Sequence, residues 1–190
     1  MDLYGWSAED LISMAYNQIP RDRLISSSPL PEAVFDLHAA WASGEDNTPL
    51  IAPFLQSAIT FGLNLQVEQK TVMTRAYVLK KTVSADKLLV PTAMTNKSNM
   101  HGYRNGKVRL INGSIDDLAA AIEAGLGIPV VNETGIDGKF DAELEFPAKD
   151  TVAAKTAIHR ILSLELREED RSITVLDIRT REGVPASAAN

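Results

Sequence analysis

Hydrophobic residues recur at helical spacing in four segments of this chain, and the segments carry helix-start signals. Ser7 and Ser114 each precede two acidic residues and a leucine, an order typical of an N-cap followed by the first helical turn. Thr48-Pro49 has the order of an N-cap followed by proline at the first helical position. The pattern predicts helices from Ser7 to before Pro20, over about 49–61, from Ser114 through Leu126, and over about 150–163.

Alternating hydrophobic and polar positions predict the strands between these helices. Residues 35–41 and 139–146 each place aromatic and aliphatic side chains on one face and polar side chains on the other. Asp137-Gly138 is a hairpin signal that would join the second strand to the β-branched run before it. We also expect a strand near 108–111, a hairpin of strands 64–69 and 74–80, and a closing hairpin of strands 164–167 and 172–179.

The two halves of the chain repeat this order of elements. Each half reads β-α-β-β-α-β-β, although no pattern marks the first strand of the first half. A recurring order favours an internal duplication, and coincidence is the alternative because such elements are common in α+β proteins. The sequence therefore predicts an α+β fold of two similar lobes with small mixed sheets packed on helices. We expect a first lobe over 1–82, a basic connector over 83–107, a second lobe over 108–182 and a flexible tail over 183–190.

Composition narrows the class of protein. Of 190 residues, 45% are hydrophobic and 23% are charged, which is typical of a packed globular protein. The chain has no cysteine, which excludes a disulfide framework, a thiolate zinc site and a cysteine nucleophile. No apolar run reaches the roughly 20 residues that span a bilayer, so we expect a chain that does not cross a membrane. The net charge of −6 argues against a nucleic-acid partner.

Candidate catalytic and metal-ligating residues are few. Asp141, Glu143 and Glu145 share one strand face, where carboxylates can hold a hard cation or act as an acid–base pair, but a solvated sheet face is the favoured interpretation. The three histidines are not at metal-ligand spacing, and no serine stands in a nucleophile elbow. Residues 168–170 are expected at a charged hairpin tip. We therefore predict no enzyme activity, no metal and no cofactor.

A turn and the connector hold the remaining candidate residues. The turn is expected to be structural because its glycines suit positive φ angles; its residues are Thr134, Gly135, Asp137 and Gly138. The connector combines basic groups with amides, glycines and a tyrosine, so it is a candidate docking site for an anionic partner, with an inter-lobe linker as the alternative. Its candidate partner-binding residues are Lys97, His101, Tyr103, Arg104 and Lys107.

The run from Pro129 to Asp141, Pro-Val-Val-Asn-Glu-Thr-Gly-Ile-Asp-Gly-Lys-Phe-Asp, resembles the hallmark of an uncharacterised bacterial extracytoplasmic family. Residues 11–16, 35–39, 76–79 and the tail around Glu182 extend the resemblance over nearly the whole chain. Members of that family come mostly from soil Acidobacteria and Planctomycetes, often behind signal peptides, and some are fused to membrane metallopeptidases that resemble antirepressor sensors. The element order of the second lobe is also similar to the short domain at the N-termini of secretins and TonB-dependent receptors, a protein-interaction module.

Three functions follow as hypotheses. The resemblance implies a periplasmic or secreted protein, although this chain begins without the basic and apolar regions of a leader. The leading hypothesis is a non-catalytic binding or sensing module that recognises a protein or a cell-envelope component. The alternatives are a hydrolase or other enzyme with a site formed between the lobes from residues distant in sequence, and a purely structural oligomerisation module.

Overall fold

The computed structural model of the chain describes residues 2–16, 19–38, 48–83, 89–93 and 99–181. Two compact units make up the chain: unit 1 comprises residues 1–71 and 174–190, and unit 2 comprises residues 72–173. The divisions fall inside two long strands and not at residues 82 and 108, where the sequence places lobe boundaries. Both units combine helices with small sheets, which confirms the predicted α+β class. The predicted tail over 183–190 lies outside the described residues.

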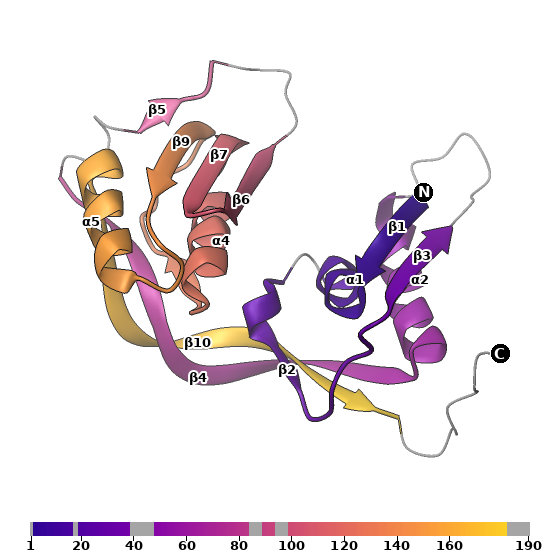
Figure 1. The fold of residues 1–190 in the computed structure, drawn as a ribbon. Coiled ribbons are helices and arrows are strands. Elements are labelled where there is room, and N and C mark those ends of the chain that lie inside the picture. Colours follow the sequence, from indigo (N-terminus) through magenta and orange to yellow (C-terminus); the bar gives the residue numbers. More distant parts are fainter. Residues whose placement is uncertain (1, 17–18, 39–47, 84–88, 94–98, 182–190) are drawn as a thin grey trace. The chain divides into compact units, whose positions relative to one another are not determined.

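Fifteen elements follow one another among the described residues, and Figure 1 labels most of them. In the first half they are β1 (Asp2–Ser7), α1 (Ala8–Ala15), the 3-10 helix η1 (Arg21–Arg23), β2 (Leu24–Ser26), β3 (Val34–His38), α2 (Thr48–Gly62) and β4 (Leu65–Lys81). In the second half they are β5 (Val90–Pro91), β6 (Met100–Arg104), β7 (Lys107–Gly113), α4 (Ile115–Leu126), β8 (Val130–Asn132), β9 (Phe140–Glu145), α5 (Thr151–Leu162) and β10 (Leu164–Thr180).

Unit 1 builds its core where α1 and α2 pack together. The buried side chains come from both helices and from the two long strands: Leu11, Ile12, Ala15, Leu55, Ile59, Leu65, Leu176 and Ile178. β1 pairs antiparallel with β3 in a two-stranded sheet. In the second sheet, β10 lies between β2 and β4 and runs parallel to β2.

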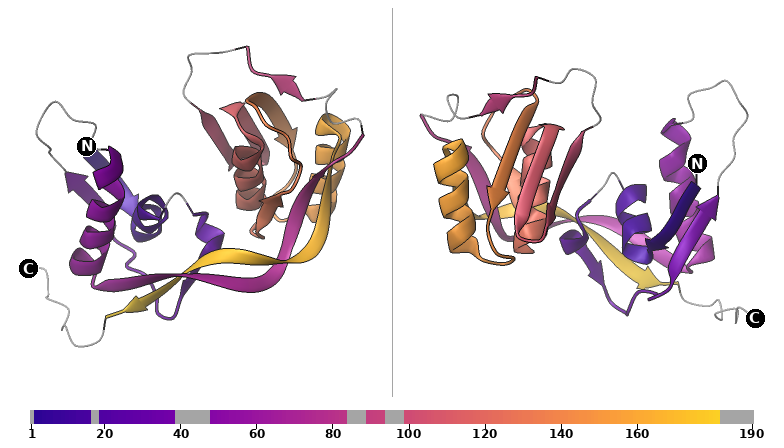
Figure 2. Two further views of the ribbon diagram at one scale, coloured as in Figure 1. Left: turned by 180° about the vertical axis from the view of Figure 1, so that it is seen from behind. Right: turned by 45° about the horizontal axis from the view of Figure 1, so that its top comes forward.

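Unit 2 has a larger core, which α4 and α5 share with two sheets. An antiparallel sheet has the order β5-β9-β7-β6, so the pair β7–β9 is flanked by a further strand on each side. The four-stranded sheet that contains β2 and β10 has the order β2-β10-β4-β8; in it β4 lies between β10 and β8 and runs parallel to β8. Leu79, Leu110, Ile122, Leu144 and Ile158 are almost completely buried between these layers. Figure 2 shows both faces of the antiparallel sheet.

Two of the three predicted N-caps, Ser7 and Ser114, are confirmed, and each forms a capping box. Thr48 is the first residue of α2, and its role as a cap stays a prediction. The Ser7 Oγ accepts from the Asp10 N–H at 3.2 Å, and the Ser114 Oγ accepts from the Asp117 N–H at the same distance. Each aspartate in turn accepts from the serine N–H. These contacts satisfy backbone donors that a helix start otherwise leaves without partners.

The strand before each capped helix contains the same bulge. The register of β1 against β3 shifts between Leu3 and Trp6, and that of β7 against β9 shifts between Leu110 and Gly113. Gly5 and Asn112 occupy these bulges with positive φ angles of 66° and 51°. The Gly5 N–H donates to the Asp36 Oδ1, and the Asn112 N–H donates to the Asp141 Oδ1; each distance is 2.8 Å. A strand with one extra residue loses a ladder partner there, and the aspartate supplies a replacement.

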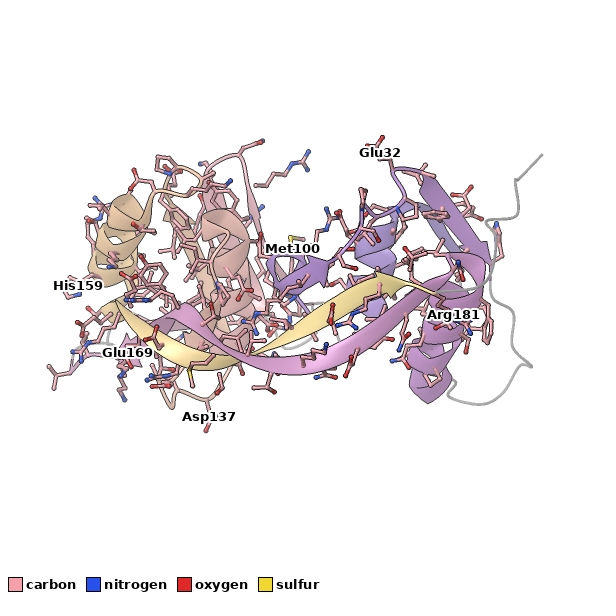
Figure 3. All side chains as sticks on the ribbon, turned by 90° about the horizontal axis from the view of Figure 1, so that it is seen from below. Glu32, Met100, Asp137, His159, Glu169 and Arg181 are labelled. Carbon is pink, nitrogen blue, oxygen red and sulfur yellow. The ribbon has the colours of Figure 1, made fainter. Side chains whose placement is uncertain are left out.

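Two predicted hairpins are wrong, because 65–81 and 164–180 are continuous strands of 17 residues each. The expected turns at 70–73 and 168–171 contain neither glycine nor proline, and their charges lie on strand faces. Arg75 pairs with Glu168 at 3.5 Å and with Asp170 at 3.2 Å, so the charged run that suggested a hairpin tip is a ladder of cross-strand pairs. Figure 3 shows Glu169 in this run.

The long strands extend the similarity between the halves. β8 pairs with β4 from Tyr77, and β2 pairs with β10 from Leu176. Both partners lie twelve residues after the start of their 17-residue strands. Each unit therefore combines a short strand of one half with the long strand of the other half. Duplication as the origin of this correspondence stays a prediction.

Two further differences concern β1 and the loop before β9. β1 supplies the first strand that no pattern marks in the first half. The Asp137-Gly138 hairpin is wrong, because β8 pairs with β4 whereas β9 pairs with β7 and β5 in another sheet. The loop changes sheets and does not return beside its own strand. None of the helices in the described ranges has the length and hydropathy needed to cross a bilayer.

Candidate functional site

An apolar groove in unit 1 is the strongest candidate for a binding site. Its volume is about 220 Å³, and we name it the unit 1 groove. The lining residues come from α1, β3, α2 and the residue after α2: Leu11, Phe35, Asp36, Leu37, Leu55, Ala58, Ile59, Gly62 and Leu63. Asp36 is the only charged residue in this set. An apolar cavity of roughly 150 Å³ already holds a benzene-sized molecule, so the groove has room for a large aliphatic side chain.

Amphipathic patterning places these side chains. Leu55 and Ile59 are one helical turn apart on α2 and are fully buried, so they form the floor of the groove. Phe35 and Leu37 alternate on β3 and are half-buried at its wall. The aromatic ring of Phe61 is 77% exposed on the same helix, and the Arg181 guanidinium lies 5.4 Å from its centre. An apolar surface that stays partly open in the folded chain is typical of a docking site.

The edge of β3 lies beside this groove. β3 pairs with β1 through Phe35↔Trp6 and Leu37↔Leu3. Within the described ranges, no strand pairs with the other edge of β3. An edge strand presents backbone N–H and C=O groups to any extended segment that reaches it. The groove and the edge therefore offer apolar contact and backbone hydrogen bonding side by side.

Asp36 has a structural partner at the groove. Its Oδ1 accepts from the Gly5 N–H at 2.8 Å, which ties β3 to the bulge of β1. Asp141 does the same for Asn112 in unit 2, so this candidate carboxylate of the predicted acidic face is also a bulge partner. A bulge leaves a backbone N–H without a ladder partner, and the aspartate carboxylate of each unit accepts that N–H. Its geometry in both units is explained by the backbone without any reaction.

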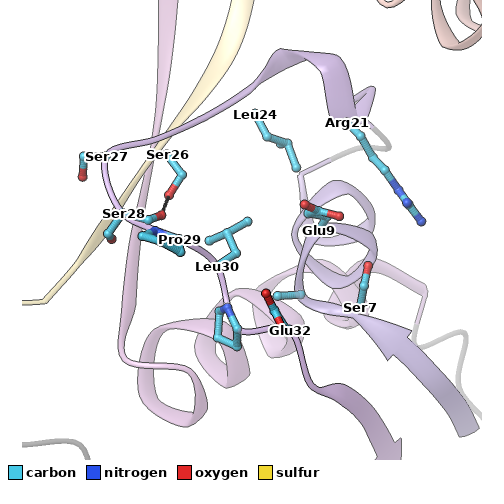
Figure 4. A pocket seen from close by; sticks show the side chains of 12 residues that line it. Ser7, Glu9, Arg21, Leu24, Ser26, Ser27, Ser28, Pro29, Leu30 and Glu32 are labelled. Carbon is cyan, nitrogen blue, oxygen red and sulfur yellow. Dashed lines mark hydrogen bonds between the residues drawn. The ribbon is translucent and has the colours of Figure 1, made fainter.

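A hollow of about 670 Å³ in unit 1 lies beside the loop that leads into β3. Figure 4 shows serines 26–28, Arg21 and Glu9 around it. The Ser26 hydroxyl donates to the Ser28 carbonyl at 2.5 Å, and Arg21 pairs with Asp10. Its lining residues include no histidine to activate a serine. We therefore assign its polar groups to the loop's own hydrogen bonding.

Four of the five candidate partner-binding residues of the connector lie on a hairpin. Residues 100–104 form β6 and pair with β7 through a turn at Asn105-Gly106, so this stretch is part of the sheet of unit 2 and not a free linker. Lys97 lies outside the described residues. The Tyr103 hydroxyl donates to the Phe146 carbonyl at 3.0 Å, and its ring packs 5.4 Å from the Phe146 ring. Tyr103 therefore has a packing role.

The remaining three described residues of that set differ in their surroundings. The Nδ1 of His101 lies 3.6 Å from an Asp117 carboxylate oxygen. Lys107 pairs with Glu145, whose pKa is lowered by this hydrogen bond, and the pKa of Lys107 is raised by it. Arg104 is exposed on β6. The hairpin presents these groups singly and does not gather them into one site.

The predicted turn is held by its own side chains. The Thr134 hydroxyl donates to the Asn132 side-chain oxygen at 2.7 Å and accepts from the Ile136 N–H at 3.2 Å. Gly135 and Gly138 have φ angles of 63° and 125°, which favour glycine. A Cβ on Gly138 would stand 3.2 Å from the Phe140 ring. Asp137, the remaining predicted turn residue, is exposed in this loop.

Charged residues in unit 2 form a network rather than a metal site. The ion pair of Lys80 with Glu169 measures 2.7 Å, and Arg171 contacts Glu133 at 2.8 Å. Hydrogen bonds from Arg171 lower the pKa of Glu133. Of the residues that the structure describes, no group of three or more histidines, aspartates or glutamates is arranged to hold a metal ion. These carboxylates are neutralised by neighbouring cations on the strand faces.

The comparisons assign the chain to a family. Residues 9–180 match the profile of a family described as a protein of unknown function, DUF3738. The chain belongs to this family, and the match extends from α1 to the end of β10. Among curated proteins and solved structures, none matches the chain significantly.

The sequence pattern marks the groove residues as apolar but does not predict a groove. Phe35, Leu55 and Ile59 fit the predicted apolar faces, and pattern alone does not distinguish a wall of a groove from a filled core. One signal was present: the apolar stripe of α2 is widened by Phe54 and Phe61, which are 40% and 77% exposed. A stripe wider than the core requires is typical of a helix with a second apolar contact.

Proposed function

We propose that this protein is a non-catalytic binding module that recognises another protein through the unit 1 groove. The observation that carries the proposal is the apolar groove beside the edge of β3 that no described strand pairs with. In this mode of recognition, backbone hydrogen bonds to the strand edge supply affinity, and pockets for side chains supply specificity. The extracytoplasmic family that the run from Pro129 to Asp141 resembles supports placing this binding in the periplasm or outside the cell.

A paired substitution on α2 tests this proposal. Ala58 lines the groove and is half-buried, whereas Ser57 beside it is exposed and its hydroxyl donates to the Pro53 carbonyl at 3.0 Å. We expect Ala58→Glu to block the groove and Ser57→Glu to leave it open, with both variants folded by circular dichroism. The selection uses a displayed library of random peptides, with the wild-type chain as bait.

Binders that depend on the groove decide the outcome. We expect selected peptides that bind the wild type and Ser57→Glu and lose at least tenfold in affinity for Ala58→Glu, because a buried carboxylate without a partner is costly. Peptides that bind all three proteins equally, or a selection that yields no binder, would overturn the proposed function.

A further inference from the structure

Unit 2 shows what covers the strand that corresponds to β3. β5 pairs antiparallel with β9 through Val90↔Asp141 and Pro91↔Phe140. The Thr92 N–H extends the pairing by donating to the Lys139 carbonyl at 2.9 Å. Leu89 precedes this pair, is 6% exposed and belongs to the core of unit 2. A segment of two paired residues with one buried leucine thus completes that side of the sheet.

The strands β3 and β9 correspond residue by residue. Both carry Phe-Asp, and in both the aspartate accepts from the bulge N–H of the neighbouring strand. The helices correspond as well, because a left-handed residue follows each of them: Asn64 after α2 and Ser163 after α5. Counting back from these residues places Leu55, Ile59 and Leu63 at the positions of Ala154, Ile158 and Leu162.

Exposure differs at these matched positions. Phe140, Ala157 and Leu162 of unit 2 are at most 7% exposed. Their counterparts in unit 1 are Phe35, Ala58 and Leu63; all three line the groove, and all three are only half-buried. Within the described part of unit 1, no strand pairs with the edge of β3 that corresponds to the edge that β5 covers in unit 2. The groove lies beside this edge.

Charge differs between the units too. Unit 1 contains 11 acidic and 5 basic residues, whereas unit 2 contains 14 of each. The whole net charge of −6 is therefore carried by unit 1. Potentials at an interface are arranged to be complementary, so an occupant of the groove is expected to carry basic residues beside its apolar one. The segment that contains β5 has this composition, because Lys87 stands two residues before Leu89.

We infer that the unit 1 groove binds an extended peptide segment of another protein as an additional strand antiparallel to β3, with one aliphatic side chain in the groove and a basic residue beside it. This inference rests on the proposed function and names the kind of partner. The first contact is backbone pairing to the edge of β3 at Val34, which corresponds to Lys139. The second is burial of the aliphatic side chain between Phe35, Ala58 and Leu63.

A synthetic peptide with the sequence of residues 87–93, Lys-Leu-Leu-Val-Pro-Thr-Ala, is the probe. It is titrated into the isotope-labelled full chain, and backbone chemical shifts are followed by NMR. We expect shifts concentrated in residues 34–37 and 55–63. Three changes in the peptide test the two contacts: Leu89→Asn, the matched control Val90→Asn, and N-methylation at Thr92.

The inference predicts a distinct response to each change. Leu89→Asn is expected to weaken binding about tenfold or more, because the transfer of a leucine side chain from water is lost. Val90→Asn is expected to change affinity less than twofold, because Val90 is 63% exposed in unit 2. N-methylation at Thr92 removes the donor to the strand edge and is expected to abolish binding. Raised salt is expected to weaken binding, because the basic residue faces an acidic unit.

Several results would overturn the inference. The absence of shifts in unit 1 at millimolar peptide would reject it. Binding that tolerates N-methylation would reject it too, because the peptide would then not need backbone pairing to the edge of β3. Slow amide exchange at Asp36 in the free chain would show that this chain's own residues cover the edge. A groove-dependent dimer in light scattering, lost in Ala58→Glu, would name a second copy as the occupant. Peptides from the display selection that still required an open groove would, in each case, leave the proposed function standing.

Discussion

Units 1 and 2 use the same local devices and reach different degrees of closure. Both have a capped first helix, a bulged strand tied to an aspartate and a parallel pairing onto a long strand. In unit 2 the pair β7–β9 has further strands on both sides, whereas the pair β1–β3 is a two-stranded sheet. The shared devices therefore set the fold, while the added strands decide whether an apolar face is covered or stays partly open.

Matched phenylalanines provide the largest test of this comparison. Phe140→Ala is expected to lower the free energy of unfolding by about 3–5 kcal/mol, the usual cost for a buried aromatic ring, because Phe140 is 7% exposed. Phe35→Ala is expected to cost roughly half as much, because the half-buried ring loses less apolar burial. Urea unfolding of both variants measures the difference. Equal costs would show that the Phe35 ring is covered as fully as that of Phe140.

Glu123 provides a test of intermediate size. This side chain is fully buried on α4 and accepts from the Val130 N–H at 2.9 Å. Tyr16, four residues after Ile12 on α1, occupies the corresponding position in unit 1 and there donates its hydroxyl to the Val67 carbonyl at 3.5 Å. Glu123→Ala is expected to cost about 1–3 kcal/mol of unfolding free energy, because a buried backbone donor loses its acceptor.

The isosteric variant separates this loss from packing. Glu123→Gln keeps an oxygen acceptor for the Val130 N–H, so its thermal midpoint is expected to lie closer to the wild type than that of Glu123→Ala. If the two variants were equally destabilised, the hydrogen bond would not be the reason why Glu123 is buried.

The capping aspartates give the smallest effect and the one most directly shared by both units. Burial alone would raise the pKa of Asp117, but hydrogen bonds from the Ser114 backbone and hydroxyl outweigh it and hold that pKa below its ordinary value. Burial alone would likewise raise the pKa of Asp10, but hydrogen bonds from Ser7 and the contact with Arg21 outweigh it and lower that pKa. A lowered folded-state pKa contributes stability above the unfolded-state pKa, which is lost as the pH falls through the folded-state pKa.

Replacement of either capping aspartate is expected to destabilise the fold at neutral pH and to matter less in acid. Asp117→Asn is expected to lower the thermal midpoint at pH 7, and the difference from the wild type is expected to shrink as the pH falls below about 4. Asp10→Asn is expected to behave alike, because its capping box has the same geometry. Midpoints measured at several pH values check this. A difference independent of pH would show that the aspartates act by shape and not by charge.

Local signals in the sequence predicted the helices and the caps at Ser7 and Ser114 correctly. Ser7 and Ser114 act within three residues of themselves, so the physics that fixes them is contained in a short window. The lengths of β4 and β10 were not predicted, because the local sequences around Lys70 and Glu169 have the polar composition of turns. Their charges have partners on other strands: Lys70 pairs with Asp177, and Lys80 pairs with Glu169. Such pairs lie about a hundred residues apart in the chain, beyond the reach of a local pattern.

The unit 1 groove could not be predicted from the sequence for a related reason. An apolar face predicts burial but not what buries it, and both Phe35 and Phe140 precede an aspartate in a strand of alternating pattern. Only the pairing of β5 with β9 distinguishes them. The Asp137-Gly138 signal failed similarly, because its turn chemistry is real while its flanking strands belong to different sheets.

The pairing of the early strand β2 with the late strand β10 has a consequence for biosynthesis. β2 leaves the ribosome early, yet its only pairing partner among the described strands is Leu176–Ile178, near the end of β10. Synthesis proceeds at roughly 5–20 residues per second, so β2 waits several seconds for its neighbour. Unit 1 is thus the first to be made and cannot be the first to be finished. A ribosome-bound fragment that ends before β10 exposes this strand without its native partner, which makes the late C-terminal residues the step that closes the N-terminal fold.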